Sequence, residues 1–141
     1  MSRSTGSDRF TMIRPLGSGG FAEVVLARDN PTGRQVVLKR PLSIDSESRE
    51  ILSREFAAVA PLDHPGIARA LDLVLDPKDG GPCLVFEAIE GVPSTLAAPT
   101  ASLERVLAWT AGIAETLVFL HGQNLIHGDL KPDNILIATG D

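Results

Sequence analysis

The sequence predicts an α+β fold, in which a sheet occupies the first half of the chain and helices dominate the second. Three strand-like runs rich in β-branched residues, at residues 10–16, 23–28 and 34–39, are separated by turns that contain glycine. Two helical patterns follow, at about residues 45–60 and at residues 102–122. Because short turns join the strands, we expect an antiparallel sheet that carries the first helix and is followed by a longer one.

A glycine-rich segment, LGSGGFAEV, occupies residues 16–24. The residues after the glycines are strand-like, so the segment predicts a hairpin and not the helix start of a dinucleotide-binding loop. It also lacks the Gly-Lys-Ser/Thr ending of a P-loop. Glycines allow the backbone N–H groups of residues 18–21 to approach phosphate oxygens. Taken alone, the pattern is equally typical of an ordinary β-turn.

The first predicted helix has Asp45 or Ser46 as its N-cap and an apolar stripe expected to be buried, formed by Leu52, Phe56 and Val59. Glu55 lies beside that stripe. A carboxylate there is unfavourable unless it is paired, and Lys39, at the end of an apolar strand, is the obvious partner.

Singly, Lys39 is more often a solvated strand lysine and Glu55 a surface glutamate. Together they predict an ion pair that joins the strand to the helix.

The most specific feature is the octapeptide HGDLKPDN at residues 127–134. It places a carboxylate, an ammonium and an amide at fixed offsets, in Asp129, Lys131 and Asn134. Phosphoryl transfer from ATP requires one group that orients a hydroxyl, one that neutralises the γ-phosphate and one that holds Mg²⁺. The octapeptide therefore predicts a phosphoryl-transfer site.

In their order and spacing, these segments resemble the protein kinase family, specifically the bacterial, eukaryotic-like (Hanks-type) Ser/Thr kinases. The resemblance covers residues 10–141 and includes the segments HPGI at residues 64–67 and LVFE at residues 84–87. It implies a protein-kinase-like fold, with a five-stranded antiparallel N-lobe, one αC-like helix and the start of a helical C-lobe.

The same resemblance implies a division of the chain. We expect residues 1–9 to be a disordered lead-in, residues 10–90 to form the N-lobe, and residues 91–141 to form the hinge exit, the long helix and the catalytic loop. Within this division, residues 76–82 are expected to be a turn between strands, and residues 91–102 a loop that links the hinge to the long helix.

The resemblance also implies a role for each matching residue. Lys39 would hold the α- and β-phosphates of ATP and pair with Glu55. Asp129 would orient the substrate hydroxyl, Lys131 would neutralise the transferring phosphoryl group, and Asn134 would bind Mg²⁺. The other expected nucleotide-binding residues form the lid over the phosphates, the apolar walls around adenine, and the gatekeeper with the hinge: Gly17, Ser18, Gly19, Gly20 and Phe21; Leu16, Val24, Val37 and Leu136; Phe86, Glu87 and Ile89.

Several positions depart from the family's pattern or need a separate interpretation. Ala22 replaces the third glycine of the lid. Gly128 replaces the arginine that in many kinases receives a phosphorylated activation loop, so we expect no switch through an Arg–phosphate pair. By the resemblance, His127 would be structural, packed beneath the loop, and would not act as a general base.

The 141 residues contain no Asp-Phe-Gly, the metal-binding motif expected roughly a dozen residues past Asn134. We therefore interpret the chain as a fragment or a truncated gene product. The absence of that aspartate argues against turnover by these residues alone.

The implied reaction is transfer of the ATP γ-phosphate to a serine or threonine hydroxyl of a protein substrate. Two alternatives stay open. Small-molecule kinases resembling the aminoglycoside phosphotransferases share a His-Gly-Asp loop with a later asparagine, but they usually lack a lysine like Lys131. A non-catalytic nucleotide-binding or scaffold fragment would keep Lys39, Asp129 and Asn134 without turnover.

Composition limits the partners. The net charge of −5 argues against nucleic acid or an anionic membrane as the main partner. Cys83 is the only cysteine, which excludes a disulfide framework, fits a cytoplasmic protein, and indicates an inert thiol on a buried strand. Neither a signal peptide nor a run of ~18 apolar residues is present.

The predicted long helix carries many apolar residues. We expect the remainder of a C-lobe, or a partner, to cover this surface, because a large exposed apolar patch marks an interface or an aggregation liability. The residues concerned are Leu103, Val106, Leu107, Ile113, Leu117 and Leu120.

Overall fold

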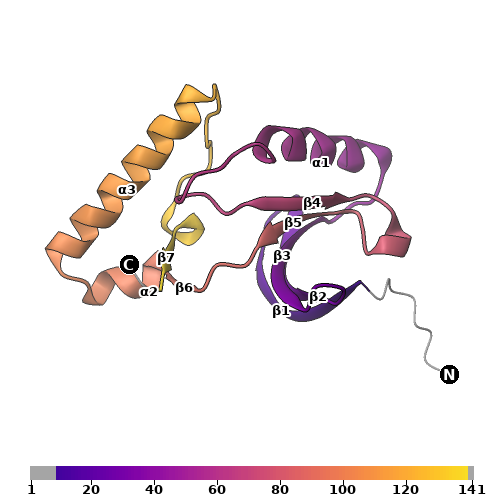
Figure 1. Cartoon of the computed structure of the whole chain (residues 1–141), viewed down its shortest axis with the longest axis horizontal. Coiled ribbons are helices and arrows are strands. Elements are labelled where there is room, and N and C mark those ends of the chain that lie inside the picture. The colour runs from indigo at the N-terminus through magenta and orange to yellow at the C-terminus, as the bar shows by residue number, and fades with distance from the viewer. Residues whose placement is uncertain (1–8, 140–141) are drawn as a thin grey trace. The chain divides into compact units, whose positions relative to one another are not determined.

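The computed structural model describes residues 9–139, and the lead-in expected at residues 1–9 lies almost wholly outside the described residues. The chain forms two compact units. The first comprises the described residues up to Asp63 together with Ala68–Ala88, and the second comprises His64–Ile67 together with the described residues from Ile89 onward. The elements of both units are labelled in Figure 1.

The first unit is built on a five-stranded sheet in which every pair of neighbouring strands is antiparallel, in the order β1-β2-β3-β5-β4. This confirms the five-stranded antiparallel sheet implied by the resemblance. The β2–β3 turn needs a glycine, because Gly33 has a φ of 71°. The strands are β1 (Phe10–Ser18), β2 (Ala22–Asp29), β3 (Arg34–Pro41), β4 (Ala70–Val74) and β5 (Cys83–Glu87).

One face of this sheet encloses the apolar core. Side chains alternate between the two faces of a strand, and the buried positions of β2 and β3 follow that period of two. Burial raises the pKa of the Cys83 thiol to about 11, so it stays protonated at neutral pH, as expected of an inert buried cysteine. The core cluster consists of Phe10, Val25, Ala27, Val36, Leu38, Val74, Cys83 and Val85.

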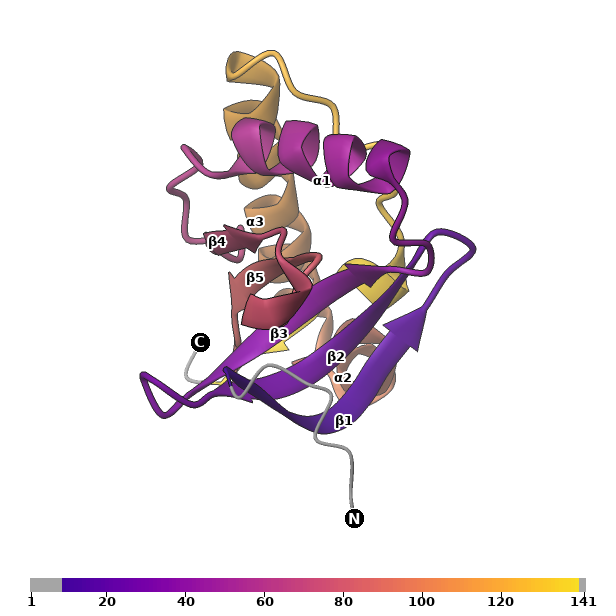
Figure 2. The same ribbon diagram turned by 90° about the vertical axis from the view of Figure 1, so that its right-hand side faces the viewer.

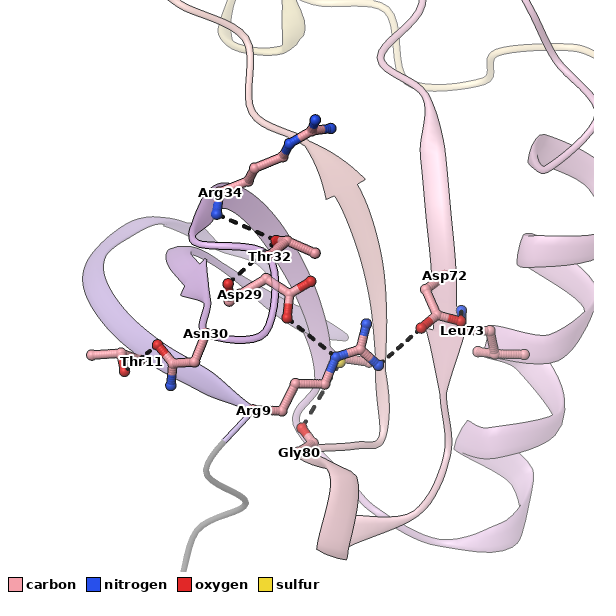
Figure 3. Close-up of polar contacts among 10 residues, drawn as sticks. Arg9, Thr11, Asp29, Asn30, Thr32, Arg34, Asp72, Leu73 and Gly80 are labelled. Carbon is pink, nitrogen blue, oxygen red and sulfur yellow. Dashed lines mark hydrogen bonds and ion pairs between the residues drawn. The ribbon is translucent and has the colours of Figure 1, made fainter.

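The two edge strands of the sheet approach each other at one end of this core. Arg9, just before β1, donates to Asp72 in β4 over 2.9 Å and to Asp29 at the end of β2 over 3.4 Å. Figure 3 shows this guanidinium reaching both carboxylates. Because β1 and β4 are the outermost strands, the Arg9–Asp72 bond closes the curled sheet around its apolar cluster.

Helix α1 (Ser46–Val59) lies across the other face of the sheet, against β4 and β5 (Figure 2). Its bounds confirm the predicted helix at residues 45–60. Asp45 is the N-cap, and its Oδ1 accepts the backbone N–H of Ser48 over 2.8 Å. This bond and a second one from the Ser43 hydroxyl lower the pKa of Asp45.

The expected buried stripe of α1 is only partly correct. Leu52 is buried, whereas Phe56 and Val59 are half-buried and Ser48 is buried instead. The face turned to the sheet thus runs through Ser48, Leu52 and Glu55, and it includes a polar and a charged residue beside the predicted leucine. The reason is that Glu55 has its partner on the sheet, so its side of the helix faces inward.

The second unit contains a two-stranded sheet and two helices. Strand β6 (Gly91–Pro93) pairs antiparallel with β7 (Leu136–Ala138) and leads into the short helix α2 (Ser94–Ala97). The loop expected at residues 91–102 was therefore wrong, since it contains both β6 and α2. Short-range patterns miss them because β6 is specified by pairing with β7, far away in the sequence.

Helix α3 (Leu103–Gly122) begins after the N-cap Ser102 and confirms the predicted long helix. The His64 ring stacks on Phe119 of this helix, with 4.8 Å between the ring centroids. Gly66 lies close to the same helix, since a Cβ at this position would collide with the Thr116 hydroxyl oxygen.

The expectation that the apolar side chains of α3 need cover is only partly correct. Leu103 and Leu107 are 73% and 59% exposed, and Val118, which was not among the expected residues, is 73% exposed. The other four expected residues are already covered to a large extent, since Leu120 is buried and Val106, Ile113 and Leu117 are half-buried. Within residues 9–139, no helix is both long and apolar enough to cross a membrane.

The central position of Leu38 in the core cluster gives a first prediction. Leu38 is fully buried, so Leu38→Ala should lower the free energy of unfolding by about 2–5 kcal/mol through lost burial and a new cavity. Urea unfolding followed by circular dichroism measures the change. The control is Ile44→Ala, at a side chain 65% exposed, which should shift stability by no more than about 0.5 kcal/mol. Equal losses in both variants would contradict this core assignment.

Candidate active site

The residues expected to act on ATP fall into two groups, one in each unit. The first unit holds the glycine-rich lid, Lys39, Glu55, Phe86 and the β2 and β3 positions expected to contact adenine. The second holds Ile89, Leu136 and the catalytic loop at residues 127–134. All residues of one group therefore lie within a single unit.

The glycine-rich segment forms the turn of the β1–β2 hairpin, as its sequence predicted. The Gly19 backbone N–H donates to the Ala22 carbonyl over 3.0 Å, and the Leu42 N–H donates to the Phe21 carbonyl over 3.0 Å. These two bonds fix the ends of the turn and leave Gly20 at its tip. The turn is thus a lid held at its base by backbone hydrogen bonds.

The chain itself has no steric need for glycine in this lid. A Cβ placed on Gly17, Gly19 or Gly20 would meet no atom within 4 Å, and none of the three has a positive φ. Glycine is otherwise expected where a backbone must adopt a left-handed conformation or allow another group to approach closely. The space beside the lid backbone is therefore open.

Lys39 and Glu55 form the ion pair predicted from the sequence. The Lys39 Nζ lies 2.6 Å from the Glu55 Oε1, and the two side chains are 36% and 31% exposed. Lys39 pairs with Val24 on β2 and with Leu84 on β5, so it projects from the face opposite the apolar core. Strand register and the inward face of α1 together bring this cation and carboxylate into contact.

Three of the residues expected in the first unit around adenine, Val24, Val37 and Phe86, share that face. Val24 lies opposite Lys39, and Val37 lies opposite Phe86, in the strand registers. All three apolar side chains are half-buried, whereas Leu16 in β1 is exposed. The Glu87 carboxylate is engaged locally, since its Oε1 accepts the Arg69 backbone N–H over 2.8 Å. The neighbours of Lys39 on this face, Val24, Val37 and Leu84, are thus apolar.

The catalytic loop brings its three predicted polar residues together. The Asn134 amide Nδ2 donates to the Asp129 backbone carbonyl over 2.8 Å and to its carboxylate Oδ2 over 3.0 Å. The Lys131 Nζ lies 3.7 Å from the Asp129 Oδ1. The three-residue turn Pro132–Asn134 sets this spacing. Since Asn134 uses its nitrogen to hold Asp129, its amide oxygen is the atom that can bind a cation.

His127 does not pack beneath the loop as expected, because its side chain is exposed. Its Nδ1 accepts the Asp129 backbone N–H over 3.1 Å, so it supports the loop by a hydrogen bond and not by packing. Gly128, between them, has a φ of 79°. This left-handed conformation gives a local reason for glycine where many kinases have arginine.

Sequence reasoning missed one contributor to this loop, Ser94. Its hydroxyl donates to the Pro132 carbonyl over 2.7 Å, and its backbone N–H donates to the Ile135 carbonyl over 2.9 Å. Ser94 lies 38 residues before Pro132, so nothing in the local pattern could indicate the contact. It ties the start of α2 to the catalytic loop.

The oxygen donors of the catalytic loop could supply only some of the ligands that a hard cation needs. Mg²⁺ prefers oxygen ligands, which the Asn134 amide oxygen and the exposed Asp129 carboxylate supply. Among residues 9–139, no cluster of three or more His, Cys, Asp or Glu side chains could hold a metal ion. These residues therefore fit part of a Mg²⁺ site, with the remaining ligands supplied by the nucleotide, water or other residues.

Comparison with known proteins decides the family. The family model of the protein kinase domain matches residues 10–141. The chain belongs to the protein kinase family.

Bacterial kinases are among the relatives of this kinase chain. It is 33% identical to the serine/threonine-protein kinase pkn2 of Myxococcus xanthus and 34% identical to the DNA damage-responsive serine/threonine-protein kinase RqkA of Deinococcus radiodurans, over 92% of the chain in each case. It is 35% identical to the serine/threonine-protein kinase PknF of Mycobacterium tuberculosis over 94% of the chain. The chain covers 16%, 20% and 29% of the lengths of these three proteins.

The backbone at Gly128 of the kinase loop gives a second prediction. Gly128→Ala should destabilise the chain by about 1–2 kcal/mol, because an L-residue is strained at this φ. The matched control is Gly112→Ala in the interior of α3, where a Cβ meets nothing within 4 Å and where stability should rise by roughly 0.5–1 kcal/mol. Urea unfolding measures both changes. A loss of stability in both variants, or in neither, would contradict the conformational argument.

Proposed function

We propose that this chain supplies the ATP-binding and catalytic-loop portion of a serine/threonine protein kinase. The observation that carries the proposal is the assembled catalytic loop, in which Asn134 holds the Asp129 carboxylate and Lys131 lies beside it. Carboxylate, ammonium and amide are the groups that phosphoryl transfer to a hydroxyl requires. The relatives named above are serine/threonine kinases, which supports the same reaction class here.

The proposed roles follow from the chemistry of each group. Asp129 orients the hydroxyl of a protein serine or threonine, and Lys131 offsets negative charge on the phosphoryl group. Lys39, held by Glu55, binds the α- and β-phosphates. The lid N–H groups donate to phosphate oxygens, for which the space above the glycines leaves room.

Adenine recognition is proposed for the apolar residues and the hinge: Leu16, Val24, Val37 and Leu136, with Phe86 as gatekeeper and Glu87 to Ile89 as the hinge. Support comes from Val24 and Val37, which share the face of Lys39 and are half-buried. Asn134 is proposed as a Mg²⁺ ligand through its amide oxygen, because its nitrogen is engaged with Asp129. Bound Mg²⁺ would neutralise phosphate charge.

We also propose a division of the chain into lobes and a cellular location for the protein. Residues 10–90 are assigned to an N-lobe and residues 91–141 to the beginning of a C-lobe. Further C-lobe helices, or a partner, would cover the exposed apolar side chains of α3, which include Leu103 and Val118. A cytoplasmic location agrees with the single buried cysteine, Cys83.

Nucleotide binding tests the first half of the proposal. Lys39→Ala should weaken binding of Mg-ATP about 10-fold or more, since it removes a charge-assisted contact to phosphate, and should leave adenosine binding unchanged. Calorimetric titration of each variant with both ligands makes the measurement. Arg54→Ala, which removes an exposed cation of α1, is the control and should not change either affinity. Failure of the unsubstituted chain to bind Mg-ATP would refute the proposal.

Phosphoryl transfer tests the second half, in the protein expressed over its whole reading frame. Asp129→Asn should reduce radiolabel transfer from ATP to a serine-containing protein by about 10²–10⁴-fold while ATP still binds. Transfer to a small hydroxylated acceptor alone would indicate a small-molecule phosphotransferase. Binding without any transfer by the unsubstituted protein would indicate a scaffold.

A further inference from the structure

We propose that Glu23 and Arg40 are positioning residues for the glycine-rich lid, an inference that rests on the proposed function. Their ion pair fixes the base of the lid to β3, beside Lys39, so that the lid N–H groups are held ready for phosphate. Neither residue belongs to the set expected to touch ATP. Their effect is exerted through the backbone of Gly19 to Ala22.

The geometry of this pair is well defined. Glu23 and Arg40 are directly opposite each other in the β2–β3 register. The Arg40 Nε and Nη2 both donate to the Glu23 Oε1, over 3.0 Å and 2.5 Å. A guanidinium that uses two nitrogens is more strongly oriented than an ammonium with a single contact.

The place of the pair in the hairpin links it to the lid. Glu23 lies opposite Ser18 on β1, so its backbone belongs to the last paired position before the turn. The two bonds that fix the turn, from Gly19 to Ala22 and from Leu42 to Phe21, lie immediately beyond it. A tether at this position limits the fluctuations of both ends of the lid.

Strand alternation places this pair on the opposite face of the sheet from the Lys39–Glu55 pair. Arg40 follows Lys39 directly in β3, so the two side chains project to opposite faces. Glu23 pairs with Arg40 on the face of the apolar core, while Glu55 pairs with Lys39 on the other. The tether of the lid is therefore separate from the contact that orients Lys39.

The ion pair between Arg9 and Asp72 provides a matched control at the other end of the same core face. It also joins strands of the first unit, but it lies at the beginning of β1, away from the lid. Glu23→Gln and Asp72→Asn each replace one carboxylate by an isosteric amide. Both substitutions should lower the free energy of unfolding. Only Glu23→Gln should loosen the lid and weaken its binding of phosphate.

The test measures dissociation constants for Mg-ATP and adenosine in the unsubstituted chain and in both variants. Glu23→Gln should raise the constant for Mg-ATP roughly 5- to 10-fold and leave adenosine unchanged, because preorganisation is lost only where phosphate binds. Asp72→Asn should change neither constant. The charge swap Glu23→Arg with Arg40→Glu should restore most of the affinity for Mg-ATP.

Hydrogen exchange in the absence of nucleotide gives an independent readout. In Glu23→Gln, the amides of Gly19 and Leu42 should exchange faster, while in Asp72→Asn they should not. Unchanged exchange, or equal weakening of ATP and adenosine binding, would overturn the positioning role while leaving the proposed function intact. If the unsubstituted chain bound no ATP, the proposed function and this inference would fail together.

Discussion

The strict alternation of side chains along β3 is the constraint on which the rest of the first unit depends. Val36 and Leu38 enter the apolar core, whereas Val37 and Lys39 project from the opposite face. A shift of register by one residue would place the ammonium of Lys39 in the core and expose the leucine. The energy of burying the core side chains therefore also fixes the orientation of Lys39, and α1 need only present Glu55 to complete the pair.

The proposed site residues of the two units are held by different kinds of interaction. In the first unit, burial and strand register orient the groups, and ion pairs close both ends of the core face, through Arg40 at the lid and Arg9 at the far end. In the second unit, the catalytic loop is largely exposed and is held by hydrogen bonds. Asn134 and Ser94 organise it, one through Asp129 and the other through Pro132. Such a loop has little core of its own, so its order depends on satisfied polar contacts.

The sequence predicted what depends on local pattern or on a specific motif. The strands, both long helices, the lid hairpin and the Lys39–Glu55 pair were confirmed, since periodicity and charge pairing specify them. Strand β6, the Ser94 contact and the Glu23–Arg40 pair were not foreseen, because each depends on a register or a contact between distant residues. The expected packing of His127 was wrong for a related reason, because a motif names a residue without giving its surroundings. The roles in ATP binding stay predictions.

In the first unit, the proposed site requires one bound nucleotide to engage the lid and Lys39 together. Paramagnetic relaxation by Mn-ATP tests this most directly, with the backbone amide signals of Gly19 and Lys39 followed in a single titration. Both signals should broaden with the same apparent dissociation constant. Broadening of only one of them, or of neither at saturating Mn-ATP, would contradict the proposed site.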